Sequence, residues 1–88
     1  MTYRVVVSPT ARRQISRLPE KARAAIIVTL YETVASDPYR VGRRLSFELS
    51  GLLVARRGEY RIVYRVIDEE RTVEILRAEH RRDVYRAR

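Results

Sequence analysis

The fold of this chain is decided by residues 60–67, which read YRIVYRVI. β-Branched and aromatic residues dominate this segment, as is typical of a β-strand, whose successive side chains point to opposite faces. One face then carries aromatic and aliphatic side chains: Tyr60, Ile62, Tyr64 and Val66. The other face carries two arginines: Arg61, Val63, Arg65 and Ile67. Because burying charge is costly, the segment predicts a strand with one apolar face and one accessible basic face.

The segments on either side predict two hairpin partners for this strand. Residues 52–57 and 72–79 are strand-like, and the connections are a tight turn at Gly58-Glu59 and a charged turn over residues 68–71. Connections this short join antiparallel neighbours. The second half of the chain is therefore predicted to form a three-stranded antiparallel meander.

The first half predicts one strand and a helical hairpin. Residues 3–8 form a short Val-rich strand, and Thr10 is the expected N-cap of a first helix. Pro19 ends that helix and can occupy the first position of the next. Apolar residues recur at helical spacing from residue 20 to residue 36, where Asp37-Pro38 follows. We expect helices within residues 10–36.

These elements predict one α+β domain over residues 1–88. An N-terminal strand and three meander strands form one sheet, with the helical hairpin on one face. Residues 38–51 are expected to be an irregular basic connection, and residues 81–88 a short helix or a loose tail.

The charge balance indicates a polyanionic partner. The 88 residues include 19 Lys and Arg against 11 Asp and Glu, a formal net charge of +8, and Lys21 is the single lysine. Arginine is suited to binding phosphate, so nucleic acid is the first candidate, an acidic protein the second and a membrane surface the least favoured.

The composition also excludes several kinds of chemistry. With no cysteine and one histidine, neither a disulfide framework nor a zinc cage is expected. We predict no metal and no cofactor. No apolar run approaches the ~20 residues that span a bilayer, and no signal peptide is evident, so we expect a cytoplasmic protein without a membrane partner.

Candidate functional residues cluster around the central strand and the C-terminus. Arg56 and Arg57 precede the hairpin turn and are expected beside Arg61, and His80 is the only side chain whose ordinary pKa lies near neutrality. Each has an alternative interpretation. Arg61 and Arg65 could be exposed sheet residues paired with glutamates (Glu59, Glu74 or Glu79), Arg56 and Arg57 part of a solvated turn, His80 structural, and Tyr85 an anchor for the tail.

The motif RRGEYRIVY at residues 56–64, followed by HRRDVY at residues 80–85, resembles the RelE branch of the RelE/ParE toxin superfamily. The resemblance implies a toxin of a type II toxin–antitoxin pair that enters the ribosome and cuts messenger RNA without a metal. It also implies a cognate antitoxin that wraps the toxin with an amphipathic, often acidic segment. Operator DNA would be bound only through that antitoxin.

The resemblance assigns roles to individual residues. Arg61 matches the arginine that binds the scissile phosphate, Arg81 matches an arginine near the C-terminus, and Tyr85 matches a tyrosine that stacks or assists proton transfer. With His80 these are the expected catalytic residues. The other arginines expected to bind RNA phosphate are Arg44, Arg56, Arg57 and Arg65.

One departure from the family pattern concerns proton transfer. Leu52 and Val54 stand where the best-known member has lysines, so the residues that act as general acid and general base are not assigned. Two other functions also remain open: a ParE-type inhibitor of DNA gyrase, and a binding-only or inactive relative.

Overall fold

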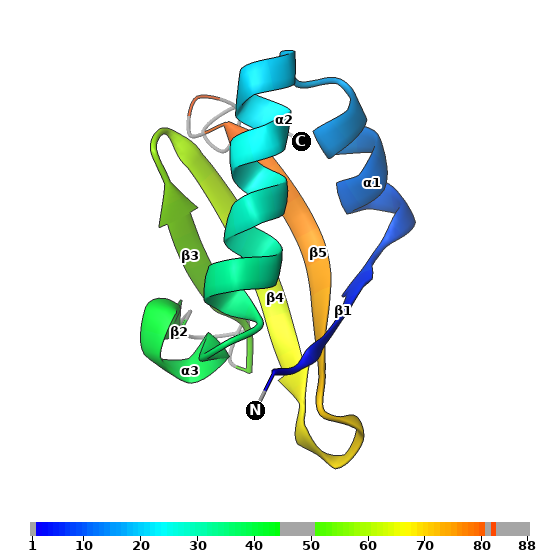
Figure 1. Ribbon diagram of the computed structural model, residues 1–88, viewed down its shortest axis with the longest axis vertical. Coiled ribbons are helices and arrows are strands. Elements are labelled where there is room, and N and C mark those ends of the chain that lie inside the picture. The colour runs from blue at the N-terminus through cyan, green and yellow to red at the C-terminus, as the bar shows by residue number, and fades with distance from the viewer. Residues whose placement is uncertain (1, 45–50, 81, 83–88) are drawn as a thin grey trace.

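The computed structural model describes residues 2–44, 51–80 and 82, which form one mixed sheet with helices packed against it (Figure 1). The strand order is β1-β5-β4-β3-β2. The strands are β1 Arg4–Val7, β2 Arg43–Arg44, β3 Leu53–Arg57, β4 Tyr60–Ile67 and β5 Thr72–His80. The helices are α1 Pro9–Ser16, α2 Glu20–Val28, a π-helical continuation η1 Thr29–Val34, and α3 Pro38–Val41.

The predicted α+β architecture is confirmed, and so is the antiparallel meander β3-β4-β5. The central strand has the predicted bounds, Tyr60–Ile67. The N-terminal strand adds to the outer edge of β5 in a parallel orientation, from Arg4 opposite Thr72 to Val7 opposite Ile75. The sheet is therefore mixed, because the helices after β1 carry the chain to the opposite edge, and the meander returns so that β5 runs parallel to β1.

The start of the first helix differs from the prediction. Ser8, not Thr10, is the N-cap, and its Oγ accepts a hydrogen bond from the Ala11 amide at 3.1 Å. Pro9 occupies the first turn, where its missing amide costs nothing. Pro9 is thus the first residue of the helix.

The expected irregular connection is partly regular. Pro38 begins the short helix α3 by the same logic, and β2 then pairs with β3, with Arg43 opposite Val54. Residues 45–50 of this connection lie outside the described residues, as does the tail except for Arg82.

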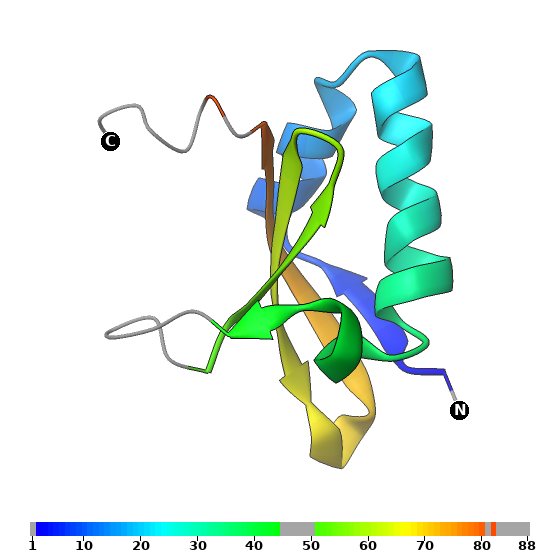
Figure 2. The same ribbon diagram turned by 90° about the vertical axis from the view of Figure 1, so that its left-hand side faces the viewer.

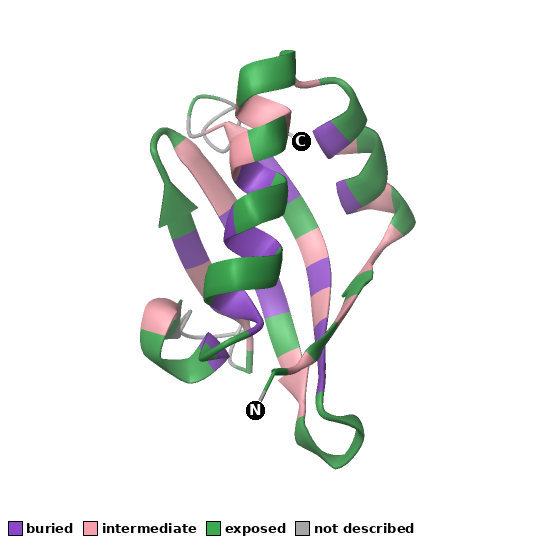
Figure 3. Cartoon of the chain, in the orientation of Figure 1, coloured by how far each residue is buried: buried purple, intermediate pink, exposed green. Residues whose placement is uncertain are grey.

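The core lies between α2 and one face of the sheet, as the buried residues in Figure 3 show. The described chain places no helix over the opposite face (Figure 2). Ile26, Leu30 and Val34 of α2 and η1 are almost completely buried. The sheet meets them with buried side chains at alternate positions: Leu53, Ala55, Ile62, Tyr64, Val73, Ile75 and Ala78. We call the opposite face of the sheet the outer face.

A β-bulge interrupts the alternation of β5. Tyr64 lies opposite Ile75, but its neighbour Val63 lies opposite Arg77, so Leu76 is an extra residue. The bulge lies where β1 ends, and Ser8 contacts it twice: its amide donates to the Ile75 carbonyl at 2.9 Å and its hydroxyl to the Leu76 carbonyl at 3.1 Å. After one extra residue, side chains that would have pointed to one face of the sheet point to the other face for the rest of the strand. Beyond Leu76, Ala78 therefore turns to the core, and Arg77 and Glu79 turn to the outer face.

A buried tyrosine connects the sheet to α3. The hydroxyl of Tyr64 donates to the Pro38 carbonyl at 2.6 Å, and burial raises the pKa of Tyr64 to about 12, so it stays protonated. Gly42 passes so close that a Cβ there would collide with the Tyr64 hydroxyl. A glycine at position 42 is therefore needed for this contact.

We predict that Gly42→Ala destabilises the protein, and that Tyr64→Phe, which leaves the Pro38 carbonyl without this donor, costs about 1 kcal/mol. Because the phenylalanine removes the atom that collides, the double variant should lose less than the two single losses combined. Urea denaturation of all four proteins measures this coupling. Strictly additive losses would contradict the steric explanation.

An acidic residue in the β4–β5 turn holds three segments together. The hydroxyl of Tyr39 donates to the Asp68 carboxylate at 2.5 Å and that of Tyr3 donates at 3.0 Å. These two hydrogen bonds hold the pKa of Asp68 below its ordinary value. The carboxylate therefore links the N-terminus, α3 and the turn.

A lowered folded-state pKa means that the ionised Asp68 stabilises the fold above the ordinary Asp pKa of about 3.9 and loses this effect as the pH falls through its folded value. We expect Asp68→Asn to lower the urea midpoint at neutral pH. The difference from the parent should shrink in acid, where both side chains are neutral. A difference that stays constant down to about pH 2 would contradict this role for the charge.

Candidate functional site

Three charged side chains form a row across the outer face. Arg56 of β3 lies opposite Arg61 of β4, and Arg61 lies opposite Glu79 of β5. Directly opposed residues have Cβ atoms about 4.5–5.5 Å apart and share a face. The sheet thus places two arginines and one carboxylate side by side, and we call these three residues the central row.

The carboxylate of the central row is held from two directions. Glu79 is only 8% exposed, and its Oε2 accepts from Arg77 Nη1 at 2.9 Å and from Gln14 Nε2 at 3.3 Å. Gln14 belongs to α1 and also accepts the Ala78 amide at 2.8 Å. Helix α1 therefore contacts the edge of β5 beyond the point where β1 ends.

Sequence reasoning did not select Gln14 or Arg77, and it considered Glu79 only as a partner for the strand arginines. The adjacent apolar residues Ile75 and Leu76 interrupt the period-two pattern of β5. Sequence reasoning did not use this interruption, which could have indicated the face of Arg77 and Glu79. A lone glutamine on a helix carries no signal by itself.

Two of the predicted site residues lie on the other side of the sheet. Arg57 is opposite Tyr60, and His80 is also opposite Tyr60, so both share the face of Tyr60 and not that of Arg61. The expectation that Arg57 lies beside Arg61 is wrong, because adjacent residues of a strand point to opposite faces. Arg56 alone of that pair joins the central row.

His80 makes specific contacts where it lies. Its Nε2 is 2.9 Å from Glu59 Oε1, its Nδ1 accepts the Arg82 amide at 3.0 Å, and its ring meets Tyr60 edge-on at 5.2 Å between centroids. Both ring nitrogens are thus engaged, in agreement with the structural alternative for this histidine.

The remaining predicted residues are divided between another part of the sheet and the undescribed segments. Arg65 forms an ion pair with Glu74 at 2.7 Å, as one alternative expected, about 13 Å along the strand from Arg61 at ~3.3 Å per residue. Arg44 is in β2 with its backbone paired to Leu53. Arg81 and Tyr85 lie outside the described residues.

The next row of the outer face is partly apolar. Val54 lies between Arg43 of β2 and Val63 of β4, and Val63 lies opposite Arg77. Leu52 precedes β3. These two positions, Leu52 and Val54, carry no group able to transfer a proton. Because arginine stays protonated, the arginines of the outer face can stabilise negative charge but are poor bases.

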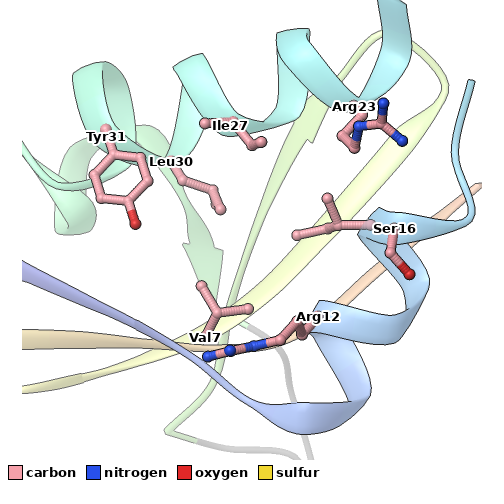
Figure 4. Close-up of a pocket in the computed structure, with 8 residues that line it drawn as sticks. Val7, Arg12, Ser16, Arg23, Ile27, Leu30 and Tyr31 are labelled. Atoms are coloured by element: carbon pink, nitrogen blue, oxygen red, sulfur yellow. The ribbon is translucent and has the colours of Figure 1, made fainter. Parts of the chain in front are cut away.

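A second feature lies between the helices. An open pocket of about 400 Å³ is formed by the apolar side chains of Val7, Ile15, Ile27, Leu30 and Tyr31, together with Arg12, Ser16 and Arg23 (Figure 4). Ile27 and Tyr31 are 42% and 53% exposed. We call this the α1–α2 pocket, and it combines exposed apolar surface with two arginines.

Within residues 2–44, 51–80 and 82, no three His, Cys, Asp or Glu side chains are grouped so that they could hold a metal ion. No helix in the same part of the chain has both the length and the apolar character needed to cross a bilayer.

Comparison with known proteins identifies relatives over nearly the whole length. A family model described as the ParE toxin of the type II toxin–antitoxin system parDE matches residues 5–85. Toxin RelG of Mycobacterium tuberculosis is 45% identical over 86 residues, covering 98% of this chain and 99% of that protein.

Solved structures agree with the observed fold. In the toxin–antitoxin complex RelBE2 of Mycobacterium tuberculosis, one chain is 42% identical and superposes with a TM-score of 0.88, covering 91% of this chain and 92% of that one. Isolated RelE of E. coli shares the fold at a TM-score of 0.73 and 20% identity, covering 89% of this chain and 83% of that one. The family match and the full-length relative together show that this chain belongs to the RelE/ParE family of type II toxin–antitoxin toxins.

Proposed function

We propose that this toxin is a ribosome-dependent endoribonuclease that cuts messenger RNA and thereby inhibits translation. The observation that carries the proposal is the central row, in which Arg56 and Arg61 lie side by side on an outer face that no described helix covers. Opposed like charges destabilise a sheet, so an anionic ligand would relieve their repulsion. The net charge of +8 also favours binding of an anionic ligand such as RNA.

The reaction that fits such a face needs no metal. The 2′-oxygen of a ribose loses its proton and attacks the adjacent phosphorus, the bond to the 5′-oxygen breaks, and that oxygen takes up a proton. Negative charge develops on the phosphorane, and fixed guanidinium groups stabilise it. In this scheme Arg61 contacts the scissile phosphate, with Arg81 as a second cation.

The residues that transfer the protons are Tyr85 and His80 in this proposal. Tyrosine beside several arginines would have a lowered pKa. For His80 to take part, the contacts with Glu59 and the Arg82 amide would have to be exchanged for contacts with substrate. The remaining arginines bind the RNA backbone in the proposal: Arg44, Arg56, Arg57 and Arg65.

Few catalytic groups come from the protein, since Leu52 and Val54 supply none. The ribosome is therefore expected to order the messenger RNA for attack, because holding reactants in a reactive geometry can supply much of a rate enhancement. Free RNA should be cut poorly.

The α1–α2 pocket is the proposed docking site for an acidic, amphipathic segment of the cognate antitoxin. Its exposed apolar residues would pack against the apolar face of that segment, and Arg12 and Arg23 would meet its carboxylates. The related structure RelBE2 is a toxin–antitoxin complex, which supports an antitoxin partner for this chain.

A second function, inhibition of DNA gyrase, is favoured by one observation: the matching family model is described as a ParE toxin. An inhibitor that only binds another protein has no need for a phosphate-binding row. Induced expression separates the two functions. Cuts inside codons of translated messages indicate the ribonuclease, and double-strand DNA breaks without such cuts indicate the inhibitor.

We predict that Arg61→Ala lowers ribosome-dependent cleavage at least about a hundredfold without unfolding the protein, because it removes the cation expected at the phosphorane. Primer extension on translated messages measures the cuts, and the thermal midpoint checks the fold. Arg17→Ala, at the exposed end of α1, is the matched control and should retain parental activity. Cleavage by Arg61→Ala at the parental rate would show that the site is elsewhere.

For the antitoxin, we predict that Arg23→Glu raises the dissociation constant at least about tenfold, because the new carboxylate faces an acidic partner. Lys21→Glu makes a similar charge reversal on the same helix outside the pocket and should change the constant much less. Isothermal titration with the cognate antitoxin measures both. Equal effects of the two reversals would place the interface away from the α1–α2 pocket.

A further inference from the structure

Glu79 is an unusual residue for a surface that is meant to bind an anion. A carboxylate within a phosphate-binding face repels the ligand, and burying it costs free energy unless it is paired. Yet Glu79 is 8% exposed and lies in the central row directly opposite Arg61. Its position needs an explanation beyond charge balance.

The fold places Glu79 there by two separate features. The bulge at Leu76, contacted by Ser8, turns the side chain to the outer face instead of the core. Gln14 then reaches from α1 to the Glu79 carboxylate and to the adjacent Ala78 amide. Because Gln14 is fixed at both ends of its amide, it fixes the carboxylate in turn.

The fixed carboxylate is surrounded by cations. Arg77 donates to it at 2.9 Å, Arg61 is its cross-strand neighbour, and Arg56 is the next residue in the row. Without a negative charge beside Arg61, the long flexible arginine side chains on adjacent strands would move apart. A guanidinium already held in place does not have to be ordered when the substrate binds.

We propose that Glu79, held by Gln14, is a positioning residue that keeps Arg61 oriented for the scissile phosphate. This inference rests on the proposed ribonuclease function, which it deepens by naming the group that arranges the catalytic cation. Arg77, paired with the same carboxylate, extends the cationic surface on the β5 side of the row.

The test compares two isosteric changes on the same strand. Glu79→Gln removes the buried charge, and Glu74→Gln removes the charge of a similar ion pair, that of Arg65, farther along the same face. A positioning role predicts that Glu79→Gln lowers kcat about tenfold or more with KM unchanged or lower, because the cation is misplaced but RNA is repelled less. Glu74→Gln should leave kcat within about twofold of the parent.

A second readout does not depend on activity. The side-chain Nε–Hε signal of Arg61, recorded by ¹⁵N NMR on the free toxin and assigned with Arg61→Lys, reports how firmly that side chain is held. We expect its hydrogen exchange to accelerate severalfold in Glu79→Gln but not in Glu74→Gln. Gln14→Met, which removes both amide contacts while keeping the charge, should shift the signal in the same direction.

The outcomes separate the two proposals. If parental toxin cuts no ribosome-bound message, the proposed function is wrong, and the Arg61 signal alone then decides whether Glu79 positions Arg61. If the toxin cleaves and Glu79→Gln leaves kcat and the Arg61 signal unchanged, the positioning role is overturned while the function stands. A rise in kcat for Glu79→Gln would also overturn it, because Glu79 would then only compete with the phosphate.

Discussion

The contact between Ser8 and the bulge of β5 is the constraint on which the outer face depends. The edge strand β1 ends opposite Ile75, and Leu76 follows as the extra residue, with its carbonyl accepting the Ser8 hydroxyl. The same hydroxyl oxygen caps α1. One side chain therefore ends a strand, begins a helix and stabilises the bulge that decides which residues of β5 face outward.

The bulge and the helix that starts at Ser8 together place charged residues on the outer face. Downstream of the bulge, Ala78 fills the core and Glu79 faces outward beside Arg61. Helix α1, which starts at Ser8, carries Gln14 to the same place. The apolar face of the sheet packs against α2 and stays buried, so charge collects on the outer face. The α1–α2 pocket, the proposed antitoxin site, lies between the helices and not on the outer face that is proposed to bind RNA.

Some of this could be predicted from the sequence because it depends on local patterns. The alternation in Tyr60–Ile67 fixed that strand and its two faces, and the short turns fixed the meander. The cross-strand register could also have shown that Arg56 and Arg57 lie on opposite faces of the sheet. Other features depend on distant contacts: the bulge is contacted by Ser8 at the end of a parallel edge strand, and its one trace in the sequence of β5 is the adjacent apolar pair Ile75 and Leu76. Simple alternation from Val73 and Ile75 would send Glu79 to the core and His80 outward, the reverse of the structure.

The central claim is that messenger RNA lies across the outer face with a phosphate at Arg61. The most direct measurement is an electron cryo-microscopy structure of the toxin on a translating ribosome, with a 2′-O-methyl message that cannot be cut. We predict that the Arg61 guanidinium lies about 3 Å from an oxygen of the phosphate that joins the modified ribose to the next nucleotide. A message bound on the helix side of the sheet, out of reach of Arg61, would contradict the account.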